Sequence, residues 1–396
     1  MIIEIPEWGN VSGLELDPAQ VAALAGWDAF ALRPDPKASQ RWQLAATQFV
    51  GVAHVGDLQI RVVPKVPVHR LLELLCIAQD RIRWDDRDTA WDETDDLVAT
   101  VARSFITQAE RVLQRGLVQG YVTIDESLFG IRGRVAISRQ IARNPGLPLP
   151  VEVTYDDYTV DVLENQLLAG AGRLLLRLKT LPTSIASRLR RLEYQLLDVT
   201  PIPASSSPPA VTWTRLNQRY RPAITLARLT LRSAALDFDG ERSTTGDGFL
   251  VDMNRVFEDV VGFGIRQALQ ADGLTVELQR QDHLDHLSHV EIRPDVLISN
   301  RSAPIAVADV KYKRPATSGI STGDLYQAVA YATRYALPCC TLIYAEPPPM
   351  NELQVGDITL KLTSLDLSQT PDARADALGD LSHNLAALHH EFASTA

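Results

Sequence analysis

Residues 293–313 read RPDVLISNRSAPIAVADVKYK, two apolar runs separated by turn-forming residues at Asn300–Pro304. This pattern predicts two strands joined by a turn. Side chains alternate between the two faces of a strand, so Asp309 and Lys311 share one face while Val310 points into the apolar layer. The stretch therefore predicts a hairpin that carries charged side chains at the rim of a hydrophobic sheet.

Asp295 follows a proline and opens the first of these strands, so the hairpin brings it across from Asp309. Two carboxylates and the Lys311 ammonium then converge, which is costly unless a cation compensates the carboxylates. Hard oxygen ligands of this kind hold Mg²⁺ while leaving positions for water and phosphate oxygens. The pattern indicates metal-dependent phosphodiester hydrolysis, with Lys311 orienting the water or stabilising the developing charge. The alternative is an exposed edge-strand lysine paired with an aspartate.

The order Pro294-Asp295 followed by Asp309-Val310-Lys311 resembles the motif of the PD-(D/E)xK nuclease superfamily. Nucleases of this superfamily often carry a further acid on the helix before the sheet. Glu258, in a helix predicted over Gly248–Gln270, takes that place. The alternative is that Glu258, at the edge of the helix's apolar stripe, only faces solvent. The resemblance implies Mg²⁺ or Mn²⁺ as cofactor and a metal site formed by Asp295, Asp309, Glu258 and Val310.

Gln327 and Tyr331 lie four residues apart in a predicted helix that begins near Asp324, so they share one helix face. They resemble the QxxxY element of the RecB-like branch of these nucleases. That resemblance implies that they position DNA or a catalytic water. The alternative is that Tyr331 packs in the core and Gln327 has no role.

Four further stretches, in order along the chain, resemble the McrC family, the nuclease subunits of McrBC-type modification-dependent restriction systems. They are VGVAHVGDLQIRVVPKVP (50–67), GIRGRVAISRQIARNPGLPLPVEVTYDDYTVDVLENQLL (130–168), RLNQRYRPAITLA (215–227) and FLVDMNRVFEDVV (249–261). With the hairpin they span nearly the whole chain.

The resemblance to McrC implies a DNA endonuclease subunit that works with a hexameric AAA+ GTPase of the McrB type. In that family the N-terminal domain inserts into the motor's central pore and stimulates nucleotide hydrolysis, the partner delivers modified or methylated DNA, and the C-terminal domain cuts it. Homodimerisation through the nuclease domain would allow both strands to be cleaved. Two alternatives remain, a non-catalytic activator docked in a AAA+ pore and a RecB-like repair nuclease.

The 396 residues carry a formal net charge of −10, which opposes non-specific DNA binding and favours a partner that brings the DNA. No GxxxxGK[ST] loop is present, so nucleotide hydrolysis is expected from the partner. The three cysteines, Cys76, Cys339 and Cys340, lack metal-ligand spacing and are predicted to be core residues in a reducing cytoplasm. No signal peptide and no membrane-spanning run are expected.

Pattern changes along the chain predict a multidomain protein of mixed α+β and α/β class. We expect a β-rich N-terminal domain with a helical segment that docks on the motor (1–150), a helical middle region (151–245) and a PD-(D/E)xK α/β domain (246–396). Strands are predicted at Met1–Ile5, Phe49–Val55, Leu58–Val66, Tyr121–Ser138, Leu274–Arg280 and Cys339–Tyr344. Helices are predicted at Pro18–Ala25 with Asp17 as N-cap, Leu71–Ile82, Leu97–Arg115, Val160–Tyr194, Trp213–Ala235 with a break at Pro222, and Ala373–Phe392.

Three other features leave alternatives open. His283, His286 and His289 have a spacing that a zinc site could use, but without a cysteine partner they are better explained as exposed loop residues. The acidic stretch 85–96, with its neighbouring tryptophans, is expected to be a solvated loop or a protein contact. Arg132 and Arg134 flank a glycine, and they are either solvated or reach into an acidic pore or nucleotide site of the motor.

Overall fold

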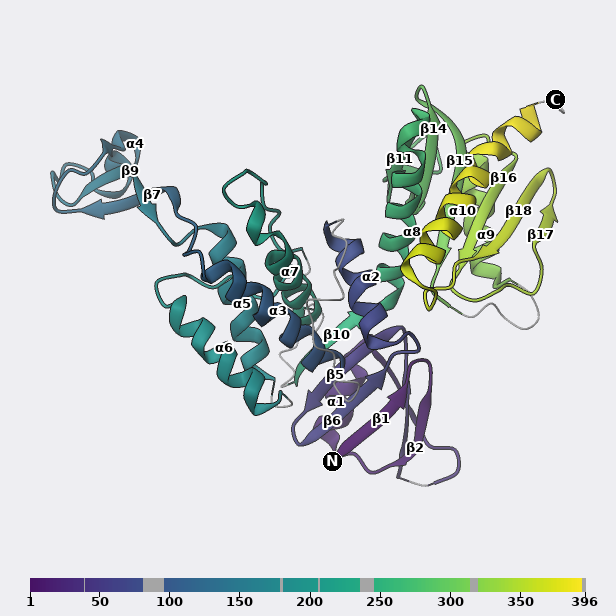
Figure 1. Ribbon diagram of the computed structural model, residues 1–396, viewed down its shortest axis with the longest axis horizontal. Coiled ribbons are helices and arrows are strands. Elements are labelled where there is room, and N and C mark those ends of the chain that lie inside the picture. Colours follow the sequence, from purple (N-terminus) through teal and green to yellow (C-terminus); the bar gives the residue numbers. More distant parts are fainter. Residues whose placement is uncertain are drawn as a thin grey trace. The chain divides into compact units, whose positions relative to one another are not determined.

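The computed structural model describes residues 1–38, 40–80, 96–178, 181–205, 207–235, 246–313 and 320–393. The chain forms two compact units (Figure 1). The first comprises residues 1–86, 244–246 and 250–396, and the second comprises residues 87–243 and 247–249. The protein is of mixed α/β class with several small sheets, as predicted. These two units group the chain differently from the three predicted domains, 1–150, 151–245 and 246–396. That division stays a prediction.

The N-terminal part of the first unit contains two small sheets. One has the strand order β1-β6-β5-β10 and the other the order β2-β4-β3. The elements are β1 (Ile2–Pro6), β2 (Asn10–Leu14), α1 (Pro18–Ala25), β3 (Phe30–Pro34), β4 (Trp42–Ala46), β5 (Phe49–Val55), β6 (Leu58–Val63) and α2 (Val68–Asp80). The predicted cap of α1 is confirmed, since the Asp17 side chain accepts from the Gln20 amide and the Gln20 side chain accepts from the Asp17 amide.

The prediction of a helix beginning at Gly248 is wrong in its first turn. Residues Gly246–Asp252 form β10, which completes the sheet beside β5, and α8 begins only at Met253. Phe249, Leu250 and Val251 are consecutive and all buried, which suits a strand covered on both faces rather than one stripe of a helix. The Asp252 side chain accepts from the Asn254 amide and so caps α8.

The C-terminal part of the first unit is a six-stranded sheet with the order β11-β14-β15-β16-β18-β17. Its elements are α8 (Met253–Leu269), η3 (Gln270–Asp272), β11 (Thr275–Leu278), β12 (Asp282–His283), β13 (Glu291–Ile292), β14 (Val296–Asn300), β15 (Ala303–Lys311), α9 (Thr322–Arg334), β16 (Cys339–Tyr344), β17 (Glu352–Val355), β18 (Ile358–Ser364) and α10 (Pro371–Ala393). The predicted hairpin is confirmed as the antiparallel pair β14–β15, and β15, β16 and β18 run parallel.

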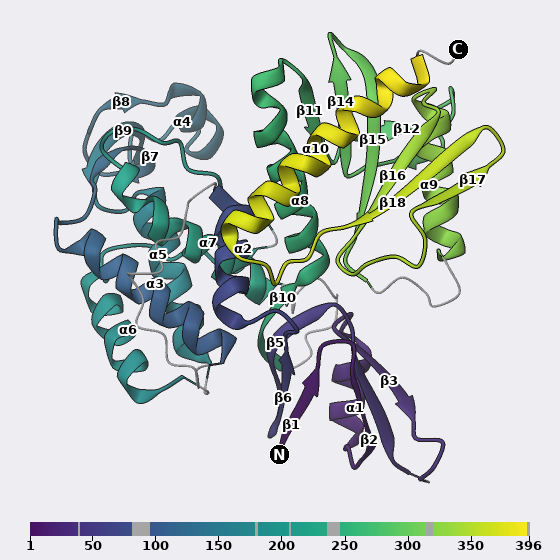
Figure 2. The same ribbon diagram turned by 45° about the vertical axis from the view of Figure 1, so that its right-hand side comes forward.

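Helices cover the two faces of this sheet. On one face, α9 packs through Ala328, Tyr331 and Ala332 against Val307 of β15 and Leu342 of β16. On the other, the Phe257 ring of α8 contacts the Tyr312 ring beyond the end of β15. α10 lies along α8 on this second face (Figure 2). Cys339 and Cys340 are buried in β16 as predicted, whereas the Cys76 side chain lies outside the described residues.

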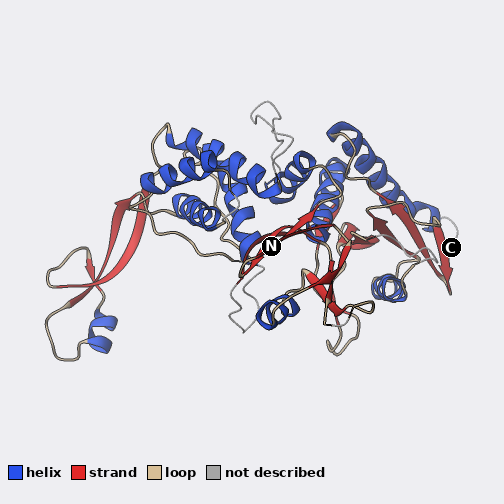
Figure 3. Cartoon of the chain, turned by 90° about the horizontal axis from the view of Figure 1, so that it is seen from below, coloured by secondary structure: helices blue, strands red, loops and turns tan. Residues whose placement is uncertain are grey.

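The second unit is mainly helical, with a small sheet in the order β7-β9-β8. Its elements are α3 (Leu97–Leu113), β7 (Gly120–Leu128), β8 (Arg134–Val135), α4 (Ile137–Arg143), β9 (Val151–Thr159), α5 (Leu163–Arg177), α6 (Thr183–Gln195), η2 (Gln218–Tyr220) and α7 (Arg221–Ala235). We call β7, β8, α4 and β9, residues 120–159, the finger. Figure 3 shows its two long strands in red with α4 beside them.

Two predictions for this unit are corrected. Residues 121–138 are not one strand, because Gly133 adopts a left-handed φ of 71° between β7 and the short β8. The helix predicted from Trp213 begins later, because η2 starts only at Gln218. The predicted break at Pro222 corresponds to the boundary between η2 and α7, and Pro222 occupies the second position of α7, where the missing amide hydrogen costs nothing. The acidic stretch 85–96 lies outside the described residues except for Asp96, which caps α3 by accepting from the Ala99 amide.

Candidate active site

β15 positions the first two charged side chains of the site. Asp309 is 1% exposed, and the Lys311 Nζ lies 2.7 Å from its Oδ2. The predicted common face of these two residues is therefore confirmed by direct contact. Val310 between them is buried on the opposite face. This ion pair sits next to the end of β15 rather than on a solvated edge strand, because β14 and β16 flank β15.

Asp295 lies opposite this pair, as the sequence predicts. Val296 pairs with Ala308, and Asp295 is the residue just before β14, one position outside the strand it was expected to open. Its Oδ2 accepts from the backbone amide of Val310 at 2.7 Å. Asp295 is buried, so its side chain both extends the hairpin pairing and brings a second carboxylate to the cluster.

The third carboxylate comes from α8 and is joined to Asp295 by a residue that the sequence reasoning missed. Gln279 Nε2 donates to Asp295 Oδ1 at 2.5 Å and to Glu258 Oε2 at 3.2 Å. Gln279 follows β11, and its backbone has a φ of 53°, in the left-handed region. No local sequence signal marks a glutamine for this conformation, which favours Gly, Asn and Asp.

Burial leaves this cluster with more negative charge than it can easily hold. Desolvation, reinforced by the charge of Asp295, raises the pKa of Glu258 to about 8. Desolvation also raises the pKa of Asp309 to about 7 even though Lys311 opposes the shift. Burial lowers the pKa of Lys311, but Asp309, Asp295 and Asp324 more than offset it, so its net shift is upward. A cation beside the carboxylates would stabilise their charged forms.

Gln327 and Tyr331 share one face of α9, as predicted, and they contact the backbone two residues before Asp295. Gln327 Nε2 donates to Tyr331 Oη at 2.8 Å, and Tyr331 Oη donates to the Arg293 carbonyl at 3.0 Å. Tyr331 is also a buried core residue, so the core alternative is correct for its ring. The described contacts make the pair a support for the Arg293–Asp295 segment, and a role toward DNA or water stays a prediction.

A second ion pair lies next to the cluster. Lys313 Nζ lies 2.7 Å from Asp324 Oδ1, and Ser321 caps α9 by accepting from the Asp324 amide. Tyr344 Oη approaches the other Asp324 oxygen at 3.5 Å. Asp324 was identified from the sequence only as the start of a helix. Its charge also acts on Lys311, so it belongs to the electrostatic surroundings of the site.

The donor chemistry fits a hard divalent cation. Three buried or half-buried carboxylates are linked into one network by Gln279, the Val310 amide and Lys311, and carboxylate oxygens are the ligands that Mg²⁺ prefers. Val310 can contribute only its carbonyl oxygen, since its amide is used by Asp295. Among the described residues, no group of three or more His, Cys, Asp or Glu is close enough to hold an ion together, so in the described arrangement a cation would contact at most two of Glu258, Asp295 and Asp309. The histidines at 283, 286 and 289 thus gain no support as a zinc site.

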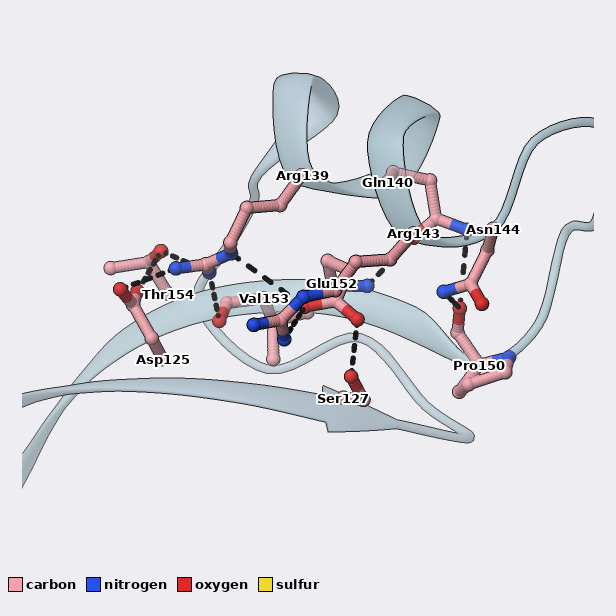
Figure 4. A network of polar contacts seen from close by, with 10 residues as sticks. All are labelled: Asp125, Ser127, Arg139, Gln140, Arg143, Asn144, Pro150, Glu152, Val153 and Thr154. Carbon is pink, nitrogen blue, oxygen red and sulfur yellow. Dashed lines mark hydrogen bonds and ion pairs between the residues drawn. The ribbon is translucent and has the colours of Figure 1, made fainter.

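The finger holds a different arrangement of charges (Figure 4). The carboxylate of Glu152, 2% exposed, accepts from Ser127 and lies 3.4 Å from Arg143 and 3.6 Å from Arg139. Arg139 also pairs with Asp125, and the guanidinium lowers the pKa of that carboxyl to about 2. These contacts tie α4 to β7 and β9.

The finger also exposes several large hydrophobic side chains. Large hydrophobic side chains are exposed along it: Tyr121, Phe129, Ile131, Ile137, Ile141, Leu147, Leu149 and Tyr158. Phe129 and Ile131 are 83% and 73% exposed. Eight large hydrophobic side chains exposed within the 40 residues 120–159 indicate a surface suited to interaction.

Two arginines of the finger, Arg132 and Arg134, follow Ile131 closely in the sequence. The Arg132 guanidinium stacks 3.9 Å above the Tyr155 ring and pairs with Asp157 at 2.6 Å, while Arg134 is exposed. Gly133 between them cannot carry a side chain, because a Cβ would lie 2.5 Å from the Thr154 carbonyl oxygen. Arg132 is therefore fixed in place, and Arg134 faces solvent.

A family model described as McrBC 5-methylcytosine restriction system component matches residues 44–345, which are 302 of the 396 residues. No curated protein sequence matches the chain. Across the described ranges, no helix combines the length and apolar character that crossing a membrane requires.

Two solved structures from Thermococcus gammatolerans are similar. The first is a chain in the refined half-complex of a tetradecameric assembly of McrB AAA+ hexamers with bound McrC. It is 18% identical with a TM-score of 0.61, over 97% of this chain and 100% of that one. The second, from a cryo-EM structure of the McrBC complex, is 20% identical with a TM-score of 0.42, over 68% of this chain and 88% of that one. At these identities the first match establishes a shared fold.

Proposed function

The chain belongs to the McrBC 5-methylcytosine restriction system component family, and from this premise we propose that it is the subunit that cuts DNA. The reaction is metal-dependent hydrolysis of a phosphodiester, and the modified DNA is delivered by a partner. The observation that carries this proposal is the buried network at the end of the hairpin, in which Asp309 pairs with Lys311, Asp295 accepts from Val310, and Gln279 links Asp295 to Glu258 of α8.

Each side chain of the cluster has a chemical role in the proposed reaction. Asp295 and Asp309 hold Mg²⁺ or Mn²⁺, with Glu258 as a third acid. When bound, the cation lowers the pKa of a water and screens the phosphate. The Lys311 ammonium, fixed by Asp309 at 2.7 Å, donates to the attacking water or to the phosphate oxygen on which negative charge develops. Tyr331 and Gln327 keep the Asp295 segment in place through the Arg293 carbonyl.

Replacement of one carboxylate by a neutral amide of the same shape tests the nuclease proposal. Asp309→Asn should abolish Mg²⁺-dependent cleavage of methylated DNA by the full chain with its GTPase partner, because it removes a hard anionic ligand while keeping the side-chain shape. Asp380→Asn, an exposed aspartate on α10, is the matched control and should cut at the wild-type rate. Wild-type cleavage by Asp309→Asn would show that the site is elsewhere. An inactive wild type with intact partner binding would favour the non-catalytic activator.

The same chain is proposed to bind a hexameric AAA+ GTPase through the finger. Two observations support this. The finger exposes a cluster of large apolar side chains, and the chain shares its fold with one found in an assembly of McrB AAA+ hexamers with bound McrC. Arg134, which is exposed at the turn of the finger, can reach an acidic surface or a nucleotide site of the motor.

Polar replacement at the tip of the finger tests this contact. The double variant Phe129→Ser, Ile131→Ser should lose binding to the GTPase and stimulation of GTP hydrolysis, because the exposed rings and methyl groups supply the buried area of the interface. Leu197→Ser is the control, since Leu197 is 64% exposed in the same unit but outside the finger. Undiminished stimulation by the double variant would place the contact on another surface.

A further inference from the structure

Gln279 is the one described residue whose side chain donates to two carboxylates of the cluster at once. Its Nε2 lies 2.5 Å from Asp295 Oδ1 and 3.2 Å from Glu258 Oε2. Its backbone amide donates to the Asp295 carbonyl at 3.0 Å. The residue is thus attached to Asp295 at both its backbone and its side chain, and it reaches from there to α8.

The backbone of Gln279 indicates that its side chain is needed. A φ of 53° is unfavourable for a residue with a Cβ, and glycine would adopt it without strain. Such conformations persist where the surroundings over-determine them, and they cluster at functional sites. A glutamine here accepts the strain and in return places an amide nitrogen between two carboxylates.

The two carboxylates need this bridge because they come from different elements. Glu258 is carried by α8 and Asp295 by the residue before β14, and like charges brought together repel. The Lys311 ammonium pairs with Asp309, so it does not bridge Glu258 and Asp295. Each carboxylate oxygen has two lone pairs, so accepting from Gln279 leaves a lone pair for a cation.

We propose that Gln279 is a positioning residue that holds Glu258 and Asp295 together as ligands for a shared divalent cation. This inference rests on the proposed function. Hydrogen-bonding partners of metal ligands orient those ligands, and their loss costs about 10–100-fold in metal affinity. In this role Gln279 acts through the two carboxylates and not on the substrate.

The variant Gln279→Gly isolates the side chain, because glycine keeps the left-handed backbone without strain. We expect the Mn²⁺ dissociation constant of the full chain, measured by calorimetry, to rise ~10–100-fold, while the melting temperature of the metal-free protein stays the same or rises. Gln279→Asn retains an amide and tolerates the left-handed backbone, so it should recover part of the affinity. Gln281→Gly, the same change at an exposed position two residues on, should bind Mn²⁺ like the wild type.

Cleavage gives a second readout. The Mn²⁺ concentration for half-maximal cleavage should rise in Gln279→Gly, and the rate at saturating Mn²⁺ should stay near that of the wild type. Wild-type Mn²⁺ affinity in Gln279→Gly, with loss of binding in Asp309→Asn, would overturn the positioning role and leave the nuclease proposal intact. Wild-type affinity in Asp309→Asn would instead overturn the nuclease site. If Gln279→Gly melts at a lower temperature than the wild type, Gln279→Asn is compared with Gln279→Ala, which lacks the amide. Equal Mn²⁺ affinity of these two variants would overturn the role of the amide.

Discussion

The active-site cluster and the finger both gather charged side chains, but they balance them differently. The cluster sets three carboxylates, Glu258, Asp295 and Asp309, against the single ammonium of Lys311. In the finger, two carboxylates, Asp125 and Glu152, meet two guanidinium groups, Arg139 and Arg143 (Figure 4).

The pKa values record this difference. Burial raises the pKa of Glu258 to about 8, whereas the guanidinium of Arg139 lowers the pKa of Asp125 to about 2. Asp125 and Glu152 of the finger already have their counter-charges, so their contribution is structural. The cluster lacks counter-charge, and a buried negative excess is stable only if a cation, or a proton, joins it. Charge balance thus separates a site built for a metal from a network that holds a surface in shape.

The largest effect we expect is on catalysis, from removing the only ammonium of the cluster. Lys311→Ala should slow the chemical step by ~10²-fold or more, because it removes an electrostatic or proton-transfer group from the reacting phosphate. Single-turnover cleavage at saturating metal and partner measures this rate.

Metal binding by the same variant is the internal control. Lys311 is not a ligand, so Lys311→Ala should still bind Mg²⁺ in calorimetry. Weaker Mg²⁺ binding by Lys311→Ala, together with a normal cleavage rate at saturating Mg²⁺, would overturn the assigned role. Lys311 would then act by orienting the metal ligands.

A smaller effect, on stability, is expected when the balanced network of the finger is broken. Glu152→Gln should lower the free energy of opening β9 by about 1–3 kcal/mol, since it leaves the buried partners Ser127 and Arg143 without their charged acceptor. Amide hydrogen exchange at Val153 measures the opening.

The control for this variant lies on the neighbouring strand. Glu126→Gln changes an exposed carboxylate that contacts only Tyr155 among the described bonds, so its effect should stay within about 0.5 kcal/mol. Equal effects of the two variants would mean that burial of Glu152 does not matter. Neither variant should change Mg²⁺ affinity, and a change would show that the finger and the cluster are coupled.

Local patterns were enough to predict the hairpin, the α1 cap and the shared face of Asp309 and Lys311. Each of these depends on residues close in sequence or on strand alternation. Glu258 was placed by family resemblance, and the structure joins it to Asp295 through a side chain 21 residues away.

Two features were beyond such patterns, because distant parts of the chain decide them. The run Phe249–Val251 is apolar enough for either a helix or a strand, and the free edge of β5 makes it a strand. Gln279 has no sequence signature, since its left-handed backbone is held by its bonds to Asp295 and Glu258. A glutamine at such a position is recognised only when the carboxylates are seen around it.

The smallest expected effect is a pH dependence of opposite sign in the two regions. The folded-state pKa of Glu258 is raised from 4.5 to about 8, so folding favours the protonated form. The stability associated with this proton is complete below about pH 4.5 and is lost as the pH rises toward 8. The metal-free first unit should therefore melt a few °C higher at pH 6 than at pH 8, since 1 kcal/mol moves the melting temperature of a unit of this size by ~2–4 °C. Glu258→Gln should flatten this dependence, and saturating Mg²⁺ should reverse it by favouring the ionised carboxylates.

Asp125, with its lowered pKa, contributes in the other direction, and its contribution is lost only as the pH falls from about 4 toward 2. If the melting temperature of Glu258→Gln depends on pH as in the wild type, the proton belongs to Asp309, and Glu258 is already ionised beside Asp295. The contrast between an undercompensated site and a balanced finger would then rest on Asp309 alone.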